Sequence, residues 1–338
     1  MHARTLSARR ASVVRLGAHM SIAGGVDKAP LRGREAGCDT IQVFTKSNRQ
    51  WAAKPLTDEQ VRAYKDNLAA TGIGPVVAHT CYLINLAAPS VSVWRRSVAS
   101  FRDEMERAER LGIPYLVTHP GSHLGAGEAE GVARVAEALN ALHAALPESA
   151  LLVLLEATAG QGTSLGRRFE EIAAILERVE ARERLGVCLD TCHLFAAGYD
   201  LRTPTGYAKT MGELAACVGL KRVKAIHLND SKAGLGSRVD RHTHIGEGAL
   251  GTGAFRLLLN DRRFRRVPMI LETPKDGDGV AADRRNLARL RRLLGWPGEP
   301  TGKGGHPTHG VGPPTHGVGD PTSRVGRPAT PSTRRGLR

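Results

Sequence analysis

Two metal-ligand candidates stand close together in one short stretch of the chain, Gly186-Val-Cys-Leu-Asp-Thr-Cys-His193. Residues 187–189 form an apolar run of the kind that fills a parallel sheet, and the polar side chains begin where this run stops. Asp190 and His193 therefore follow a predicted buried strand at its C-terminal end. A carboxylate and an imidazole in that position are suited to bind a divalent metal ion.

The same arrangement recurs along the chain, because other short apolar runs also end in a titratable residue. A single histidine at a strand end is more often a hydrogen-bonded core residue than a metal ligand, so the inference depends on the number of such groups. Burying so many of them without a metal would carry large desolvation and like-charge costs. The candidate ligands are five histidines and four carboxylates, at strand ends or in the following loop: His79, His119, His193, His227, His242, Glu156, Asp190, Asp240 and Glu272.

Nine candidates exceed the three ligands that one catalytic zinc takes from a protein, which favours a centre with more than one ion. Imidazole-rich ligation favours zinc or manganese over magnesium. Asp240 and His242 stand two residues apart in a predicted loop, and with His193 they would form a three-ligand site with open positions. Such a centre suits a phosphodiester substrate, because several cations can activate a water, polarise the phosphorus and stabilise the leaving oxygen.

These side chains need a fold that brings several strand ends together. Short apolar runs alternate with amphipathic segments, and each kind occurs eight times between residues 13 and 294. The pattern predicts an α/β fold, a single (β/α)8 TIM barrel, with its site at the C-terminal face of the strands. A doubly wound open sheet is the alternative, but it would spread the polar groups along an edge instead of around one ring.

The predicted strands are 13–18, 40–44, 75–78, 115–118, 151–155, 186–189, 223–226 and 268–271, and the predicted helices are 27–36, 57–70, 90–110, 128–146, 169–181, 207–218, 253–261 and 281–294. Thr57 followed by Asp58-Glu59-Gln60 predicts a capping box at a helix start. Gly72 and Gly112 stand where helices are expected to end.

The composition is that of a globular chain with basic ends. It has 338 residues, 41% of them hydrophobic, and no apolar run near the roughly 18 residues of a membrane span. Five cysteines without C-x-x-C spacing indicate a reducing, cytoplasmic location. Of the net charge of +15, residues 1–15 and 297–338 contribute +4 each. The remaining +7 would attract a polyanion but does not separate nucleic-acid binding from solubility.

Three segments are predicted from these shifts in composition. They are a basic N-terminal extension at 1–15, a barrel domain at 16–296 and a disordered, Pro/Gly-rich basic tail at 297–338. The extension lacks the apolar stretch of a secretory signal, and a transit peptide is the alternative for it. Histidines in the tail's imperfect repeat fit a biased composition better than a metal site, which needs fixed geometry: His306, His309 and His316.

The motifs that carry these residues resemble endonuclease IV, the zinc-dependent AP endonuclease family of DNA base-excision repair. The resemblance covers residues 16–296, and so many long motifs in the same order make it specific. The motifs lie at 17–25, 44–51, 79–86, 119–123, 156–162, 186–193, 227–230, 236–242 and 271–273.

The resemblance implies a TIM barrel with three Zn²⁺ ions that hydrolyses the phosphodiester 5′ to an abasic site in duplex DNA and leaves a 3′-hydroxyl. It implies that Glu156 and Glu272 are catalytic carboxylates, that Glu156 bridges two ions, and that the enzyme is a monomer without a membrane partner. The implied ligand sets are His79, His119 and Glu156; Glu156, Asp190, His227 and Glu272; and His193, Asp240 and His242.

The resemblance also implies that Arg49, Tyr82 and Leu83 enter the duplex at the lesion. An arginine before Gln-Trp and a Tyr-Leu pair just after a metal-ligand candidate would make a wedge, because an abasic nucleotide lacks a stacked base and is extruded at low cost. The alternative is that Tyr82 and Leu83 only pack a loop.

Three positions depart from the usual residues of the family. Thr80 replaces an aspartate or another polar residue, Cys81 replaces a serine and Ala157 replaces an asparagine. The loss of an asparagine beside Glu156 would remove a hydrogen bond that supports a metal ligand, with an expected cost in metal affinity or rate.

Two other functions compete with the nuclease. A sugar isomerase or epimerase would share the metal-bearing barrel but need only one or two ions, which would leave the third ligand set and the wedge residues without a role. A non-enzymatic, basic nucleic-acid-binding protein would explain the charged ends but not nine inward polar groups. The number of zinc ions per chain distinguishes these functions.

The tail generates a first prediction. If residues 297–338 touch phosphates transiently, a protein truncated after Trp296 should keep its metal and its rate at saturating DNA but bind more weakly at low salt. The slope of log K against log salt should become shallower by about 0.9 for each phosphate that the tail neutralises. Titrations of both proteins across a salt series test this, and identical slopes would show that the tail is an inert extension.

Overall fold

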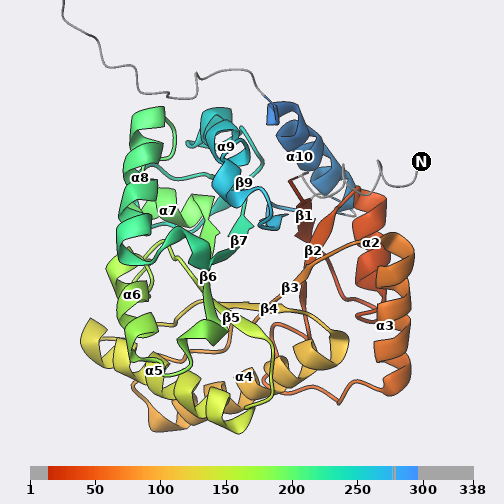
Figure 1. The fold of residues 1–338 in the computed structure, drawn as a ribbon, viewed down its shortest axis with the longest axis vertical. Coiled ribbons are helices and arrows are strands. Elements are labelled where there is room, and N and C mark those ends of the chain that lie inside the picture. Colours follow the sequence, from red (N-terminus) through yellow and green to blue (C-terminus); the bar gives the residue numbers. More distant parts are fainter. Residues whose placement is uncertain (1–13, 276, 278, 296–338) are drawn as a thin grey trace, which may run out of the picture. The chain divides into compact units, whose positions relative to one another are not determined.

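The computed structural model describes residues 14–275, 277 and 279–295, and these form a closed barrel of eight parallel strands (Figure 1). The order around the barrel is β1-β10-β7-β6-β5-β4-β3-β2, so the first and last barrel strands close the ring. The prediction of a (β/α)8 barrel is confirmed, and the open-sheet alternative is wrong. The predicted tail, and all but two residues of the predicted N-terminal extension, lie outside the described residues.

Each predicted strand and helix overlaps an observed one. The barrel strands are β1 (Leu16–His19), β2 (Thr40–Phe44), β3 (Val76–His79), β4 (Tyr115–Thr118), β5 (Leu152–Glu156), β6 (Leu185–Asp190), β7 (Val223–His227) and β10 (Met269–Leu271). The surrounding helices are α2 (Lys28–Ala36), α3 (Asp58–Thr71), α4 (Val91–Leu111), α5 (Glu128–Ala145), α6 (Phe169–Arg178), α8 (Pro204–Cys217), α9 (Gly251–Leu259) and α10 (Val280–Leu293). Short 3₁₀ helices span Arg182–Arg184, Leu220–Arg222 and Arg262–Phe264.

Apolar side chains form two layers, one inside the barrel and one between the strands and the helices. The strands are buried on both faces, which explains why they read in the sequence as continuous apolar runs. The larger outer layer includes residues from all the barrel strands and from the inward faces of the helices. The inner cluster, one residue from each of six strands, consists of Val77, Val117, Leu154, Cys188, Ala225 and Ile270.

Local signals set the helix ends. Thr57 forms the predicted capping box at the start of α3, because its hydroxyl accepts from the backbone N–H of Gln60 while the Gln60 side chain accepts from that of Thr57. The helices α3 and α4 end at Gly72 and Gly112, with φ of 67° and 73°, a left-handed conformation that glycine adopts without steric cost. Both predictions are confirmed.

Besides the 3₁₀ helices, three short elements were not predicted, and two of them carry candidate ligands. Helix α7 (Thr191–Ala197) directly follows β6, where the Asp190 carboxylate caps the helix by accepting from the backbone N–H of His193 at 2.9 Å. Strands β8 (Asp230–Ser231) and β9 (His242–Thr243) form a separate antiparallel pair. The prediction that His193 and His242 lie at a strand end or in a loop is therefore wrong, since one lies on a helix and the other begins a strand.

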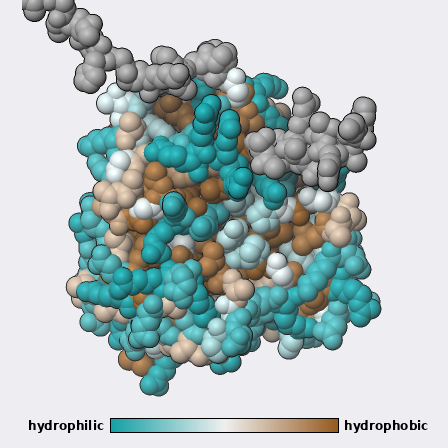
Figure 2. Space-filling model, in the orientation of Figure 1, coloured by the Kyte–Doolittle hydropathy of each residue, from teal (hydrophilic) through white to brown (hydrophobic). Residues whose placement is uncertain are grey.

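On the face seen in Figure 2, hydrophilic residues cover the periphery and patches of hydrophobic residues lie between them. In the part of the chain that the structure describes, no helix is long and apolar enough to cross a membrane.

The packing of β1 against β2 leaves no room for a side chain at Gly17, where a Cβ would collide with the Thr40 carbonyl group. Gly17→Ala should destabilise the protein by about 1–3 kcal/mol or more, the cost of overpacking. The matched control is Gly212→Ala in the exposed part of α8, where an added Cβ meets nothing within 4 Å and should stabilise by about 0.5–1 kcal/mol. Urea unfolding of both variants checks this, and a Gly17→Ala midpoint at or above wild type would contradict it.

Candidate metal centre

Six of the candidate ligands form one layer at the mouth of the barrel, directly above the inner apolar cluster. Each stands two residues after a member of that cluster, and alternate residues of a strand point to the same face. Leu154, for example, fills the barrel interior and Glu156 projects into its mouth. The six are His79, His119, Glu156, Asp190, His227 and Glu272. The register of the strands therefore brings these side chains together.

Glu156 lies at the centre of the layer, and its side chain is 1% exposed. Its Oε2 atom lies 3.1 Å from Nε2 of His79 and 3.3 Å from Nε2 of His119. Its Oε1 atom lies 3.0 Å from Nδ1 of His227 and 3.2 Å from Nδ1 of His193. The two carboxylate oxygens therefore face different groups of imidazoles, which is the arrangement of a bridging ligand.

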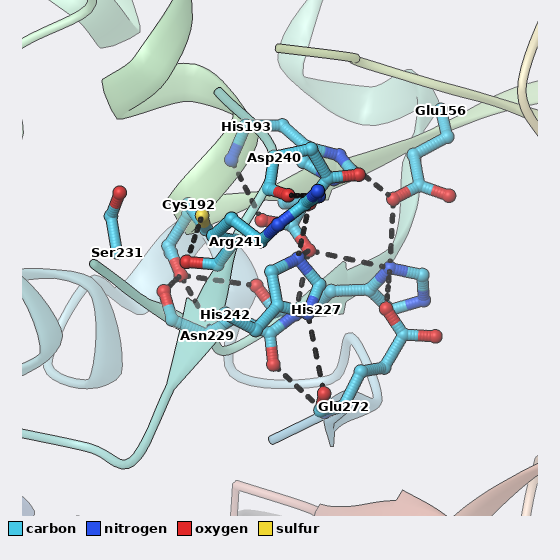
Figure 3. Close-up of polar contacts among 12 residues, drawn as sticks. Glu156, Cys192, His193, His227, Asn229, Ser231, Asp240, Arg241, His242 and Glu272 are labelled. Carbon is cyan, nitrogen blue, oxygen red and sulfur yellow. Dashed lines mark hydrogen bonds and ion pairs between the residues drawn. The ribbon is translucent and has the colours of Figure 1, made fainter. Parts of the chain in front are cut away.

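A second group surrounds His227 (Figure 3). Its Nδ1 atom lies 3.2 Å from Oε2 of Glu272 and 3.8 Å from Oδ2 of Asp190, in addition to the contact with Glu156. These four residues place one ligand atom each within 4.8 Å of one another, as do His79, His119 and Glu156. Two of the three implied ligand sets are thus brought together, and Glu156 belongs to both.

The third set gathers around Asp240, which follows the turn before β9. Its Oδ2 atom lies 3.2 Å from Nε2 of His193, and its Oδ1 atom lies 3.2 Å from Nε2 of His242. Both nitrogens are buried, and neither makes a hydrogen bond to any described residue. Two buried imidazole nitrogens that face one carboxylate without a hydrogen bond fit a metal ion held between them.

Two further side chains lie beside the ligand set around Asp240. Asp190 lies within ligand distance of His193 and His242, and Cys192 lies within ligand distance of Asp240 and His242. Cys192 was not among the ligands predicted from the sequence. Burial raises the pKa of its thiol to about 12, so it stays protonated unless a metal displaces the proton.

Four of the five candidate histidines contact an oxygen acceptor of the protein through one ring nitrogen. Such a contact fixes the tautomer, because that nitrogen carries the proton and the other ring nitrogen keeps a lone pair that can bind an ion. The contacts are His79 Nδ1 to Thr80 O at 2.8 Å, His193 Nδ1 to Ala157 O at 3.0 Å, His242 Nδ1 to Glu272 O at 3.2 Å and His227 Nε2 to Gln42 Oε1 at 2.8 Å.

Two amide side chains support the ligands and were not predicted from the sequence. Gln42 is fully buried on β2 and donates to Oε1 of Glu272 at 2.5 Å while it accepts from His227. Asn229 donates to Oδ2 of Asp190 at 2.6 Å and accepts from the backbone N–H of Glu272. The available signal was a polar residue inside an apolar strand for Gln42, and the position two residues after His227 for Asn229.

The buried charged groups of the centre shift one another's pKa values. Burial alone would raise the pKa of Glu156, but the charges of His227 and His119 outweigh it and hold the pKa well below the usual value. Burial alone would lower the pKa of His193, but Asp190, Asp240 and Glu156 hold it well above the usual value. A divalent cation that takes the place of these protons satisfies the same carboxylates, so its binding should release protons.

The three predicted DNA-contacting residues lie on two loops at the mouth. Arg49 is exposed in the loop between β2 and α3. Tyr82 is 68% exposed in the loop between β3 and α4, and its ring packs edge-on against Phe44 at 5.5 Å between centroids. Leu83 is half-buried and packs on the core. Loop packing therefore accounts for Leu83 better than for Tyr82.

Comparison with known proteins decides the family. Residues 32–293 match the family model described as xylose isomerase-like TIM barrel. The chain is 56% identical over 280 residues to the probable endonuclease 4 of Chloroflexus aurantiacus, across 83% of this chain and 98% of that protein. It is 53% identical over 279 residues to the probable endonuclease 4 of Geobacter sulfurreducens, across 82% and 94%. The chain belongs to the endonuclease IV family.

Solved structures agree with this assignment. Endonuclease IV from Thermus thermophilus matches with a TM-score of 0.74 and 40% identity, across 83% of this chain and 98% of that one. A D-tagatose 3-epimerase-like protein matches with a TM-score of 0.62 but only 16% identity, which shows a shared fold alone. The resemblance found in the sequence is confirmed, and with it the class of enzyme, a metal-using endonuclease of DNA repair. Neither alternative function has comparable support.

The Asp240 group generates the next prediction. His193→Ala or Asp240→Ala should lower the bound divalent metal by about one equivalent, since each removes a ligand from an ion that has few others. Cys192→Ala is the matched control, and it should keep the full metal content if the thiol is only a neighbour. Metal analysis of the purified variants checks both, and full metal in His193→Ala and Asp240→Ala would show that this ligand set was misassigned.

Proposed function

We propose that the protein hydrolyses the phosphodiester 5′ to abasic sites in duplex DNA, leaving a 3′-hydroxyl, at a centre of three zinc ions. The observation that carries the proposal is the linkage of the ligand groups, because Glu156 belongs to two of them and Asp190 of the second group also lies within ligand distance of His193 and His242 of the third. Independent sites would not need shared carboxylates, whereas ions that act together on one phosphate do.

The donor types fit zinc. Five imidazoles and four carboxylates favour zinc over magnesium. His79, His119 and Glu156 would hold one ion, Glu156, Asp190, His227 and Glu272 the second, and His193, Asp240 and His242 the third. When bound, such ions neutralise the phosphate and the charge that develops on the leaving oxygen.

The two catalytic carboxylates of this proposal differ in access to solvent. Glu156 is 1% exposed, so its role is to hold the ligand groups together, whereas Glu272 is 20% exposed. Although burial opposes it, the charge of His227 lowers the pKa of Glu272 to about 2, so the carboxylate is ionised at neutral pH. Gln42 donates to Oε1 of Glu272 and Oε2 lies 3.2 Å from Nδ1 of His227, so the proposed role of Glu272 is to hold the second ion beside the reacting phosphate.

The choice of an abasic site would depend on Arg49, Tyr82 and Leu83. An exposed aromatic ring beside the centre can fill the gap left by an extruded nucleotide, and an exposed arginine can hold the adjoining backbone. Tyr82 supports the proposal because it is 68% exposed while its ring lies beside Phe44 and the candidate ligand His79.

The proposal includes a cytoplasmic monomer that acts alone on DNA. All five cysteines are unpaired thiols, which fits a reducing compartment.

The shared carboxylate provides the test. Glu156→Gln should keep the fold but lower kcat on a duplex with one abasic site by at least about 100-fold, because changes to the outer partners of metal ligands already cost about 10–100-fold. Cleavage of a labelled duplex, together with metal analysis, measures this.

The matched control is Glu177→Gln, the same chemical change on the exposed face of the helix that follows β5. It should cleave like the wild type. Near wild-type turnover by Glu156→Gln with intact metal content would reject the bridging role, and a wild type that cuts intact and abasic duplex equally would reject the abasic-site specificity.

A further inference from the structure

The two loops that carry the proposed DNA-contacting residues pack against one helix. Residues 45–57 connect β2 to α3 and include Arg49, and residues 80–90 connect β3 to α4 and include Tyr82. Both loops contact the same polar stripe of α4, which lies beside the apolar stripe that packs on the barrel. The stripe consists of Ser97, Ser100, Glu104 and Arg107, all buried and spaced three or four residues apart as one helix face requires.

The first loop is fixed to this stripe by a buried ammonium group. The Lys46 side chain is 1% exposed, and its Nζ atom donates to Oδ2 of Asp103 at 2.8 Å and to the hydroxyl of Ser100 at 3.0 Å. It lies 3.6 Å from Oε1 of Glu104, and it also donates to the Trp51 carbonyl at 3.0 Å, which closes the loop on itself. Lys46 is therefore a tether three residues before Arg49.

The second loop reaches the same carboxylate. The backbone N–H of Cys81 donates to Oε1 of Glu104 at 3.1 Å. One oxygen atom of a 1% exposed side chain thus contacts both loops, through Lys46 of the first and Cys81 of the second. The other oxygen, Oε2, is buried and has no hydrogen-bond partner among the described residues.

Flanking contacts repeat the pattern on either side of Glu104. Towards the start of the helix, the Ser97 hydroxyl accepts from the backbone N–H of Asn85 in the second loop at 3.0 Å. Towards its end, Arg107 donates to the carbonyls of Ala53 and Lys54 in the first loop at 3.0 and 2.5 Å. Glu104 lies between these contacts and is the member of the stripe that touches both loops.

Stability alone does not explain this arrangement. A buried ion pair can often be replaced by apolar residues without loss of stability. A buried carboxylate with one oxygen that lacks a hydrogen-bond partner lowers stability, because that oxygen has lost its hydration. The arrangement is useful if Arg49 and Tyr82 must enter the same lesion. Displacement of a positioning group by about 1 Å can lower the reaction rate by about 100-fold.

We propose that Glu104 is a positioning residue for damage recognition, which sets the spacing of the Arg49 and Tyr82 loops through its shared contacts with Lys46 and Cys81. The inference rests on the proposed abasic-site function. It adds a residue that touches neither the DNA nor the metal ligands and that acts on selectivity between abasic and intact duplex.

The test compares Glu104→Ala with the more conservative Glu104→Gln in the full-length, metal-loaded enzyme. Glutamine keeps an acceptor for the Cys81 N–H but loses the charge that faces Lys46, so it should retain the fold and restore part of the selectivity. The matched control is Glu106→Gln on the same helix, whose partner Arg102 is exposed and contacts neither loop. The measurements are kcat and KM on an abasic duplex, Kd for the intact duplex, and fluorescence of 2-aminopurine placed beside the lesion.

Glu104→Ala should raise KM on the abasic duplex by roughly 10–100-fold, leave Kd for intact duplex within about twofold, and reduce the 2-aminopurine signal. Metal content and kcat should stay near wild type, whereas a loss of fold would lower them together. Glu104→Gln should fall between Glu104→Ala and wild type, and Glu106→Gln should match wild type.

A double-mutant cycle with Tyr82→Ala completes the test. If Glu104 acts by placing the Arg49 and Tyr82 loops, its removal should cost less selectivity in the Tyr82→Ala background than in the wild type. Independent, multiplying effects, or unchanged selectivity in Glu104→Ala, would overturn the proposal. A wild type without abasic preference would instead reject the proposed function, so the two failures are distinguishable.

Discussion

The structure depends on the burial of one carboxylate. Glu156 lies almost wholly out of water, and its two oxygens face four imidazoles within 3.3 Å. A charge in that position is tolerated only when positive charge surrounds it, so the neighbouring strands must end in residues that can carry or bind such charge. The histidines compensate the charge of this carboxylate, and the remaining carboxylates compensate the charge of the histidines. The centre is therefore one electrostatic unit and not nine separate residues.

The register of the barrel strands brings these titratable residues together. Six strands each place an apolar residue in the inner cluster and a titratable residue two positions later, so the apolar plug and the polar layer are built from the same strands. A slip of one residue in any strand would turn its ligand outward and an apolar side chain into the mouth. The apolar cluster beneath the layer thus helps to position the candidate ligands.

The sequence predicts what is local and misses what depends on tertiary contacts. His79, Glu156 and His227 follow apolar runs directly, so the barrel and the layer could be predicted together. Gln42 reads as one polar residue in a strand, and nothing in its neighbourhood shows that it will contact Glu272, which is far away along the chain. Helix α7 is short, and β8 and β9 pair beside a loop that depends on tertiary contacts. The Asp230 carboxylate organises this loop by accepting from the backbone N–H groups of Ser231, Gly246, Gly248 and Leu250. Glu104 resembles any other charge on an amphipathic helix until both loops are folded onto it.

The orientation of His79 and His193 by main-chain carbonyls has a consequence for sequence divergence. The oxygens of residues 80 and 157 exist whatever side chains these positions carry, so Thr80 and Ala157 leave the tautomers of both histidines intact. Substitution at these two sites therefore leaves the orientation of both histidines unchanged, although the hydrogen bond that an asparagine at position 157 would offer is still lost. A sequence search that requires particular side chains at positions 80 and 157 would miss functional relatives. The contact to His227, by contrast, comes from the side chain of Gln42, so position 42 cannot change without losing it.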